Sequence, residues 1–171
     1  MKGARSMGQK ILMAFVFLAI FVGVHLTGDL IPVRTPFFGV SESVWEHLKM
    51  GFWSYGITYS IFWAARRRGS LSGLFSGTLF ALGAIFILYY TSLNLGALPG
   101  RLPLALDIAL VSLITFVSGL LGAEAGDLAD STAASGGFLV ASGILWVLLL
   151  ILFIVYTYHQ PPLPLFLEPA L

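Results

Sequence analysis

Residues 41–50, SESVWEHLKM, concentrate ionisable side chains directly before a long apolar run. They include Glu42, Glu46, His47 and Lys49. Histidine and carboxylate ligands suit zinc, manganese or iron, and a nearby glutamate can take a proton from a metal-bound water. The same groups without a metal would relay protons or bind a small ligand. The residue types therefore predict a polar site, and its chemistry stays open between these readings.

Helix capping explains part of this cluster. Ser41 or Ser43 can cap a helix, and Ser43 with Glu46 has the spacing of a capping box. Glu42 also suits the positive end of a helix dipole, and Lys49 follows Glu46 by three residues and can neutralise it. The segment EHLKM has no second histidine four residues on, so it is not the HExxH motif of zinc proteases.

The composition indicates that these residues belong to a membrane protein. Of 171 residues, 58% are hydrophobic and 10% are charged, whereas soluble domains carry about 25% charged residues. We therefore expect an all-α integral membrane protein, with residues 1–171 forming one bundle of five transmembrane helices. Apolar runs of about 20 residues place the spans at about 10–28, 43–65, 71–92, 102–122 and 137–158.

Several functional classes are excluded. The chain has no cysteine, which rules out disulfides, iron–sulfur clusters, thiolate zinc sites and palmitoylation. A net charge of +1 argues against nucleic acid as a partner, and phosphate-loop and dinucleotide motifs are absent. The first apolar run is long and lacks a cleavage site, so we expect an uncleaved first helix.

The distribution of basic residues predicts the orientation. Lys and Arg collect in cytoplasmic loops, and six of them lie before the first span or between the second and third. We therefore expect a cytoplasmic N-terminus and an extracytoplasmic C-terminus, in the plasma membrane of a prokaryote. Segment 123–137 would be an acidic, mobile cytoplasmic loop. The cytoplasmic residues are Lys2, Arg5, Lys10 and Arg66–Arg68, against Arg34 and Arg101 on the other side.

This topology places all three histidines in one layer. His25 lies near the end of the first span, His47 starts the second and His159 ends the fifth, all within roughly 10 Å of the outer interface at 1.5 Å per residue. Asp107 enters the fourth span from the same side, and an acid inside a span usually faces a partner or a wet cavity. The expected metal ligands are His25, His47, Asp107 and His159, with Glu46 or Glu42 as the base and Lys49 beside them.

The helical period separates two faces of the second span. At about 100° per residue, Glu42, Glu46 and Lys49 share one stripe, and His47 projects about 100° away from Glu46. The two sets can face different neighbours or flank one pocket. In the third span, Gly69, Gly73 and Gly77 form a stripe of small residues that predicts close packing against a neighbouring helix or, in a homo-oligomer, a second subunit.

Two motifs carry a resemblance. HLTGDLIPVRTPFFGVSESVWEHLKMGFW, residues 25–53, resembles small polytopic membrane proteins of unknown function with the hallmark NESVWEHLK, and TYHQPPLPLFLEP, residues 157–169, is similar to their C-terminal pattern of PLF, an acid and proline. The chain departs from the hallmark at Ser41, where the family has asparagine, and both residues cap helices. The resemblance implies that the motifs belong together, and supplies no activity. Matching positions are His25, Glu42, Trp45, Glu46, His47, Lys49, Asp107, His159, Pro162 and Glu168.

The C-terminal segment 159–171 is too rich in proline to continue a helix. We expect this external tail to fold over the outer mouth of the bundle, burying Phe166 and bringing Glu168 near His47. Loop 27–41 would form the other half of this lid. The alternative is a tail that lies in the lipid headgroup layer.

The function that these residues favour is a metal-dependent intramembrane enzyme, hydrolase-like, acting on a lipid-like substrate in the outer leaflet. One alternative is a transporter or a protein that binds an ion or a small molecule. The inner halves of the spans carry mainly Ser, Thr and Gly, which favours a one-sided site over a continuous charged path. The second alternative is a scaffold in which the polar cluster is structural.

Overall fold

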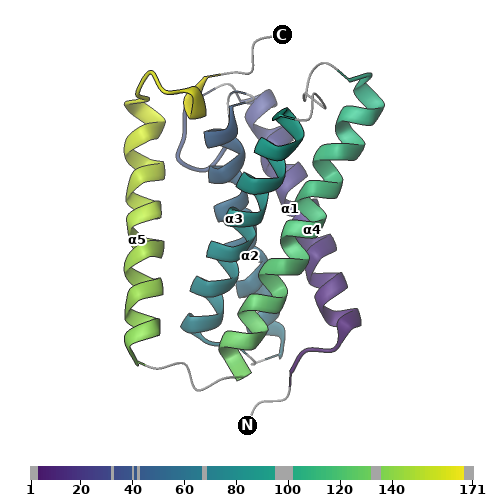
Figure 1. The fold of residues 1–171 in the computed structure, drawn as a ribbon, viewed down its shortest axis with the longest axis vertical. Coiled ribbons are helices and arrows are strands. Elements are labelled where there is room, and N and C mark those ends of the chain that lie inside the picture. The colour runs from purple at the N-terminus through teal and green to yellow at the C-terminus, as the bar shows by residue number, and fades with distance from the viewer. Residues whose placement is uncertain are drawn as a thin grey trace.

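The chain folds into five long helices that run side by side (Figure 1). The structure is a computed structural model, and it describes residues 4–31, 33–39, 41, 43–66, 69–94, 102–131 and 136–167. Within these residues all regular secondary structure is helical. The elements are α1 (Met7–Leu30), α2 (Val44–Arg66), α3 (Leu71–Asn94), α4 (Leu104–Ser131), α5 (Gly136–Tyr158) and the short 3₁₀ helix η1 (Pro164–Phe166).

Side-chain caps explain where helices begin. Ser6 and Gln9 form a reciprocal capping box at the start of α1. The Ser43 hydroxyl accepts a hydrogen bond from the Glu46 amide at 3.3 Å, which satisfies a donor in the first turn of α2. Ser70 does the same for the Gly73 amide at 3.1 Å before α3.

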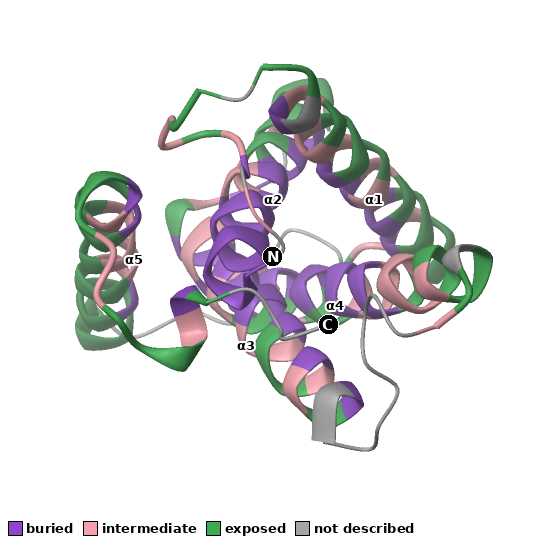
Figure 2. Ribbon diagram, turned by 90° about the horizontal axis from the view of Figure 1, so that it is seen from above, coloured by how far each residue is buried: buried purple, intermediate pink, exposed green. Residues whose placement is uncertain are grey.

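Helix α2 is the most deeply buried of the five helices in the described residues, above all along its first half. Figure 2 shows it as the most continuously buried ribbon, with α5 on one side and α1 and α4 on the other. Its inward face is aromatic: Phe52, Tyr55 and Tyr59 are almost fully buried. Helix α5 stands apart from α1 and α4, because α2 and α3 lie between them (Figure 2). The two sides of α2 therefore face different helices, α5 on one side and α1 and α4 on the other.

Glycines let α3 approach its neighbours closely. A Cβ on Gly77 would collide with the Tyr55 side chain, and one on Gly126 of α4 would lie 2.9 Å from the Gly73 carbonyl oxygen. A Cβ on Gly122 would lie 2.8 Å from the Gly77 carbonyl oxygen. The predicted small-residue stripe thus packs against α2 and α4 of the same chain, and this packing needs no second copy.

The exterior of the bundle is apolar. Among the described residues, four helices are long and apolar enough to cross a membrane: Met7–Gly28, Leu71–Ser92, Ala105–Ser131 and Gly136–Tyr158. The exposed faces of α1 and α5 carry mainly Leu, Ile, Val and Phe. These features fit an integral membrane protein. Helix α2 is less apolar because it carries Glu46, His47 and Lys49, and these three residues are buried inside the protein.

The expectation for segment 123–137 was wrong over most of its length. Helix α4 continues to Ser131 rather than ending near residue 122. The acids in this stretch form hydrogen bonds and ion pairs with the N-terminal residues, so the helix end is held in place. The bundle has a histidine end, where α1 ends and α2 begins, and an acidic end, where α4 ends.

Candidate functional site

His25 and His47 form a pair at the histidine end. Their ring centroids lie 5.8 Å apart, with the rings edge to face at 71°. His25 comes from the last turns of α1 and is half-buried, whereas His47 comes from the first turn of α2 and is 2% exposed. The rings of Phe21 and Tyr89 lie 6.2 Å and 5.2 Å from the His47 ring. The pair therefore sits between α1, α2 and α3 in mainly aromatic surroundings.

A backbone carbonyl sets the tautomer of His47. Its Nδ1 lies 2.9 Å from the carbonyl oxygen of Ser43, one helical turn earlier. A carbonyl only accepts hydrogen bonds, so Nδ1 carries the hydrogen and donates it. In the neutral imidazole the lone pair is then on Nε2, which is the form that ligates a metal or accepts a proton.

Glu46 and Lys49 form a buried ion pair beside the histidines. The Lys49 ammonium lies 2.7 Å from the Glu46 carboxylate, and both residues are 0% exposed. Lys49 also donates to the carbonyl of Thr35 at 3.0 Å and to the hydroxyl of Thr157 at 3.4 Å. Gln160 donates to the other Glu46 oxygen at 3.3 Å. The pair thus connects α2 to loop 33–39, to α5 and to the tail.

The two clusters occupy different faces of α2. His47 contacts α1 and α3, whereas Lys49 and Glu46 contact α5, the tail and loop 33–39. Consecutive helical residues project about 100° apart, which is why neighbours in the sequence reach opposite partners. The Glu46 carboxylate is neutralised by Lys49 and belongs to a cluster separate from the imidazole pair.

The tail and the first loop pack over this end. Phe166 is 7% exposed, and its ring lies 4.7 Å from that of Trp45. The indole of Trp53 donates to the Pro36 carbonyl at 2.6 Å, and the Phe37 ring lies 4.8 Å from that of Trp53. The buried ion pair is therefore shielded from solvent by two separate segments.

Other predicted site residues lie elsewhere. His159 is exposed just after the end of α5. Figure 2 shows helix α5 separated from α1 by α2 and α3. Asp107 is half-buried in the first turn of α4, and its Oδ1 has no hydrogen-bond partner among the described residues. Glu42 and Glu168 lie outside the described residues. Trp45 packs in an aromatic cluster with Phe153, Tyr156 and Phe166.

In the part of the chain that the structure describes, no three His, Asp or Glu side chains are grouped so that they could hold one metal ion. The four predicted ligands are thus not brought together as a set. Among the described residues, the imidazoles of His25 and His47 lie close enough together to share one ion. Any further ligand would be water, substrate or a residue outside the described ranges.

Comparison with models of protein families shows which family the chain belongs to. The model described as "Family of unknown function (DUF6512)" matches residues 5–170. The chain belongs to this family. The match confirms the resemblance to an uncharacterised family. Comparisons of this DUF6512 protein with curated proteins and with solved structures find no match.

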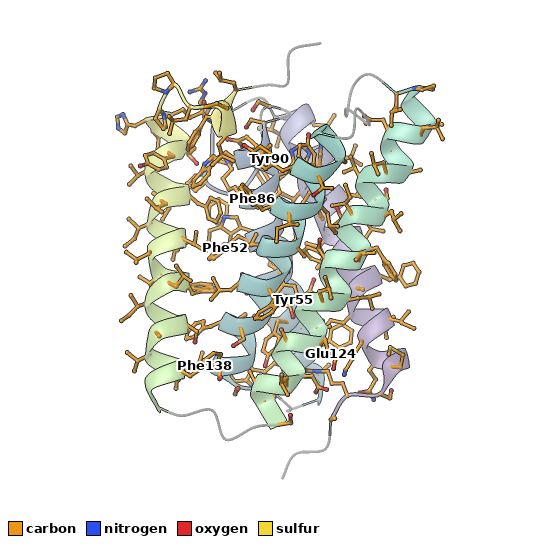
Figure 3. The ribbon with its side chains drawn as sticks, in the orientation of Figure 1. Phe52, Tyr55, Phe86, Tyr90, Glu124 and Phe138 are labelled. Carbon is orange, nitrogen blue, oxygen red and sulfur yellow. The ribbon has the colours of Figure 1, made fainter. Side chains whose placement is uncertain are left out.

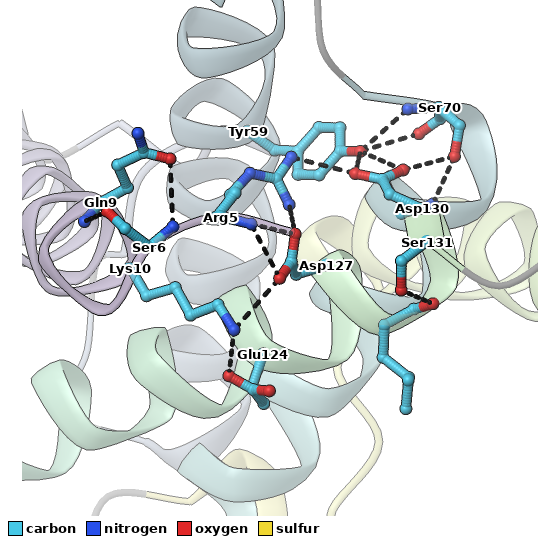
Figure 4. A network of polar contacts seen from close by, with 12 residues as sticks. Arg5, Ser6, Gln9, Lys10, Tyr59, Ser70, Glu124, Asp127, Asp130 and Ser131 are labelled. Atoms are coloured by element: carbon cyan, nitrogen blue, oxygen red, sulfur yellow. Dashed lines mark hydrogen bonds and ion pairs between the residues drawn. The ribbon is translucent and has the colours of Figure 1, made fainter. Parts of the chain in front are cut away.

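The acidic end of this DUF6512 protein holds a second polar network that the sequence analysis above did not predict (Figure 4). Both carboxylate oxygens of Asp127 accept from the Arg5 amide, at 2.9 Å and 3.1 Å. The Arg5 guanidinium donates to Asp130 at 3.0 Å, and Lys10 lies 2.6 Å from Glu124 and 3.1 Å from Asp127. The N-terminal segment is therefore fastened to the end of α4.

Tyr59 extends this network to the turn between α2 and α3. Its hydroxyl donates to Asp130 at 2.8 Å, and the Ser70 hydroxyl donates to the same carboxylate at 2.5 Å. Burial alone would lower the pKa of Arg5, but the hydrogen bond that its guanidinium donates to the Tyr59 oxygen, with the negative charges of Asp130 and Asp127, outweighs burial and raises that pKa above its ordinary value. Arg5 therefore stays charged and fixed.

A signal for this network was present. Glu124, Asp127 and Asp130 follow one another at three-residue spacing and share a helix face. Acidic residues that extend an apolar helix must be paired with basic residues or solvated. Arg5 and Lys10 are basic residues that the sequence places on the same side of the membrane as these acids. Figure 3 shows Glu124 at the opposite end of the bundle from Tyr90.

Proposed function

We propose that this integral membrane protein binds a divalent transition-metal ion, zinc, manganese or iron, through His25 and His47. The observation that carries the proposal is the separation of the two ring centroids, 5.8 Å. With Zn–N bonds of ~2 Å and a centroid ~1 Å behind each nitrogen, two imidazoles on one ion have centroids ~5–6 Å apart. Rotation of the side chains about χ1 and χ2 would aim both nitrogens at the ion.

The hydrogen bonding of His47 supports this reading. Metal-bound histidines usually donate their other ring nitrogen to a carbonyl or carboxylate, and His47 Nδ1 lies 2.9 Å from the Ser43 carbonyl oxygen. The aromatic walls formed by Phe21 and Tyr89 limit water around the pair. Two protein ligands leave coordination positions open, so a bound ion could hold water or a ligand from the membrane interface.

We assign Glu46 and Lys49 a structural role in this site. Their mutual ion pair at 2.7 Å, together with Gln160 and Thr157, holds α5 and the tail against α2. Using Glu46 as a base toward a metal-bound water would require breaking this pair. His25 and His47 are therefore the residues to test first.

A metal-dependent hydrolase acting on a lipid-like substrate is the second candidate. It is favoured by loop 33–39 and the tail, which pack over the histidine end of the bundle on the ion-pair face of α2, since excluding water strengthens electrostatic catalysis. In that case the ion would lower the pKa of its bound water and supply the nucleophile. The chemistry would be ester or amide hydrolysis at the level of the lipid headgroups.

Metal content of the purified protein tests the proposal. Inductively coupled plasma mass spectrometry, before and after loading with Zn²⁺, Mn²⁺ or Fe²⁺, should find near-stoichiometric metal in the wild type. His25→Ala and His47→Ala should lose it, whereas His159→Ala is the matched control because His159 is exposed on α5. Absence of metal after loading, or equal metal in His47→Ala, contradicts the metal site.

The hydrolase candidate has a separate readout. Metal-loaded protein in vesicles should release fatty acid or headgroup from lipid, and His47→Ala should abolish the release. Bound metal without hydrolysis would leave the binding function in place and reject the enzyme.

A further inference from the structure

An apolar groove of about 530 Å³ runs along α2 on the side that faces α5. One wall is a stripe of α2 from Trp53 through Gly56 and Ser60 to Ala64, and the other walls include Trp146 of α5 and Leu74 of α3. These eleven residue steps correspond to ~16 Å along the helix. The groove extends from the middle of the bundle toward the acidic end and does not include the histidines.

Small side chains and the placement of α5 create this space. A Cβ on Gly56 would meet nothing within 4 Å, and the Ser60 hydroxyl donates to the Gly56 carbonyl at 2.8 Å, within its own helix. Beside the groove, the Trp146 ring lies 4.7 Å from that of Phe52, which Figure 3 shows between α2 and α5. The groove is thus held open by an aromatic contact.

The surroundings of the groove indicate an apolar occupant. Ile57 and Ile61, on its lining, are 44% and 48% exposed on the apolar exterior of the bundle. An apolar void gains no hydrogen bonds from water, and its lining loses dispersion contacts when it is empty. In a bilayer, the neighbouring molecules that reach this face are lipids, and an extended acyl chain matches the length of the groove.

The sequence has a run of three arginines just after the part of α2 that lines the groove. Helix α2 ends at Arg66, two residues after the lining residue Ala64, and Arg67 and Arg68 follow in the sequence. Basic residues next to a membrane helix attract anionic headgroups, and arginine recognises phosphate. In the sequence, these basic residues directly follow the part of α2 that lines the groove.

We propose that the groove binds one acyl chain of an anionic phospholipid, with the headgroup at the acidic end of the bundle. This lipid site is independent of the histidine pair and of any metal. The bound acyl chain fills the groove between α5 and the second half of α2, and so stabilises the packing of these two helices.

Native mass spectrometry of the full-length protein in detergent tests this site. Delipidated protein is titrated with phosphatidylglycerol or with phosphatidylcholine of the same acyl chains. The wild type should retain one phosphatidylglycerol, and phosphatidylcholine at least tenfold less. Gly56→Leu and Ser60→Leu fill the groove and should reduce retention tenfold or more. Gly23→Leu on α1 is the matched control, since a Cβ there also meets nothing within 4 Å, and it should bind as the wild type does.

Three outcomes would overturn the proposal. Retention of neither lipid rejects the site, and equal retention of both lipids rejects the anionic headgroup. Unchanged retention in Gly56→Leu and Ser60→Leu, with melting temperatures like that of the wild type, rejects the groove as its location. The wild-type comparison of the two lipids stands even if one variant fails to fold. Replacing Arg66, Arg67 and Arg68 with glutamine should lower phosphatidylglycerol retention to the level of phosphatidylcholine.

Discussion

Lys49 is the residue whose loss should most weaken the histidine end. It is 0% exposed, and its ammonium lies 2.7 Å from Glu46 and 3.0 Å from the Thr35 carbonyl. Lys49→Met would leave the Glu46 carboxylate buried without its counter-charge. Removing one partner of a buried ion pair costs about 3–5 kcal/mol, so we expect a loss of this size in the free energy of unfolding, measured by denaturant titration in detergent.

Two comparisons make the Lys49 prediction specific. The double variant Glu46→Gln, Lys49→Met removes both charges and should recover part of the loss, because no uncompensated charge remains. Glu124→Gln is the control at the acidic end: its side chain is 62% exposed although it pairs with Lys10 at 2.6 Å, and an exposed pair contributes less than about 1 kcal/mol. Wild-type stability in Lys49→Met would show that the pair is not buried as described.

At the scale of elements, the contact between α3 and α4 depends on glycine. A Cβ at Gly122 would lie 2.8 Å from the Gly77 carbonyl oxygen and 2.6 Å from the Tyr55 ring. A backbone oxygen cannot move aside without shifting its helix. We therefore expect Gly122→Ala to lower the free energy of unfolding by about 1–3 kcal/mol, the usual cost of overpacking.

Gly83→Ala is the opposite case in the same pair of helices. A Cβ at Gly83 meets nothing within 4 Å, and alanine is favoured over glycine inside a helix by about 0.5–1 kcal/mol. Gly83→Ala should therefore raise stability while Gly122→Ala lowers it, in the same denaturant titration. A loss of equal size in both variants would mean that helix propensity and local flexibility, rather than close packing, decide the effect.

The helices could be predicted from the sequence because apolar runs of membrane length are visible one segment at a time. The end of α4 could not be predicted, since the acids at 124–130 are held there by pairing with Arg5 and Lys10, which are distant in the sequence. Similarly, the position of a histidine within its span predicts its depth in the membrane, but it does not predict which neighbouring helix the side chain faces. His159 is exposed just after the end of α5, whereas His25 of α1 pairs with His47.

At the scale of the whole molecule, the orientation in the membrane follows from charge. The N-terminal segment and the α2–α3 connection supply most of the basic residues, and both belong to the acidic end. Arg5 and Lys10 are neutralised there by Asp127 and Glu124, but Lys2 and the run Arg66–Arg68 still outweigh the basic residues of the other end. We therefore predict that the acidic end is cytoplasmic, by the positive-inside rule.

Single-cysteine labelling measures this orientation without background, because the chain has no cysteine of its own. Leu163→Cys at the histidine end and Met7→Cys at the acidic end are suitable, since the two side chains are 53% and 67% exposed. On intact bacterial spheroplasts, a membrane-impermeant maleimide should label Leu163→Cys and reach Met7→Cys only after permeabilisation. The reverse pattern would place His25 and His47 at the cytoplasmic face, where a metal would come from the cytoplasmic pool.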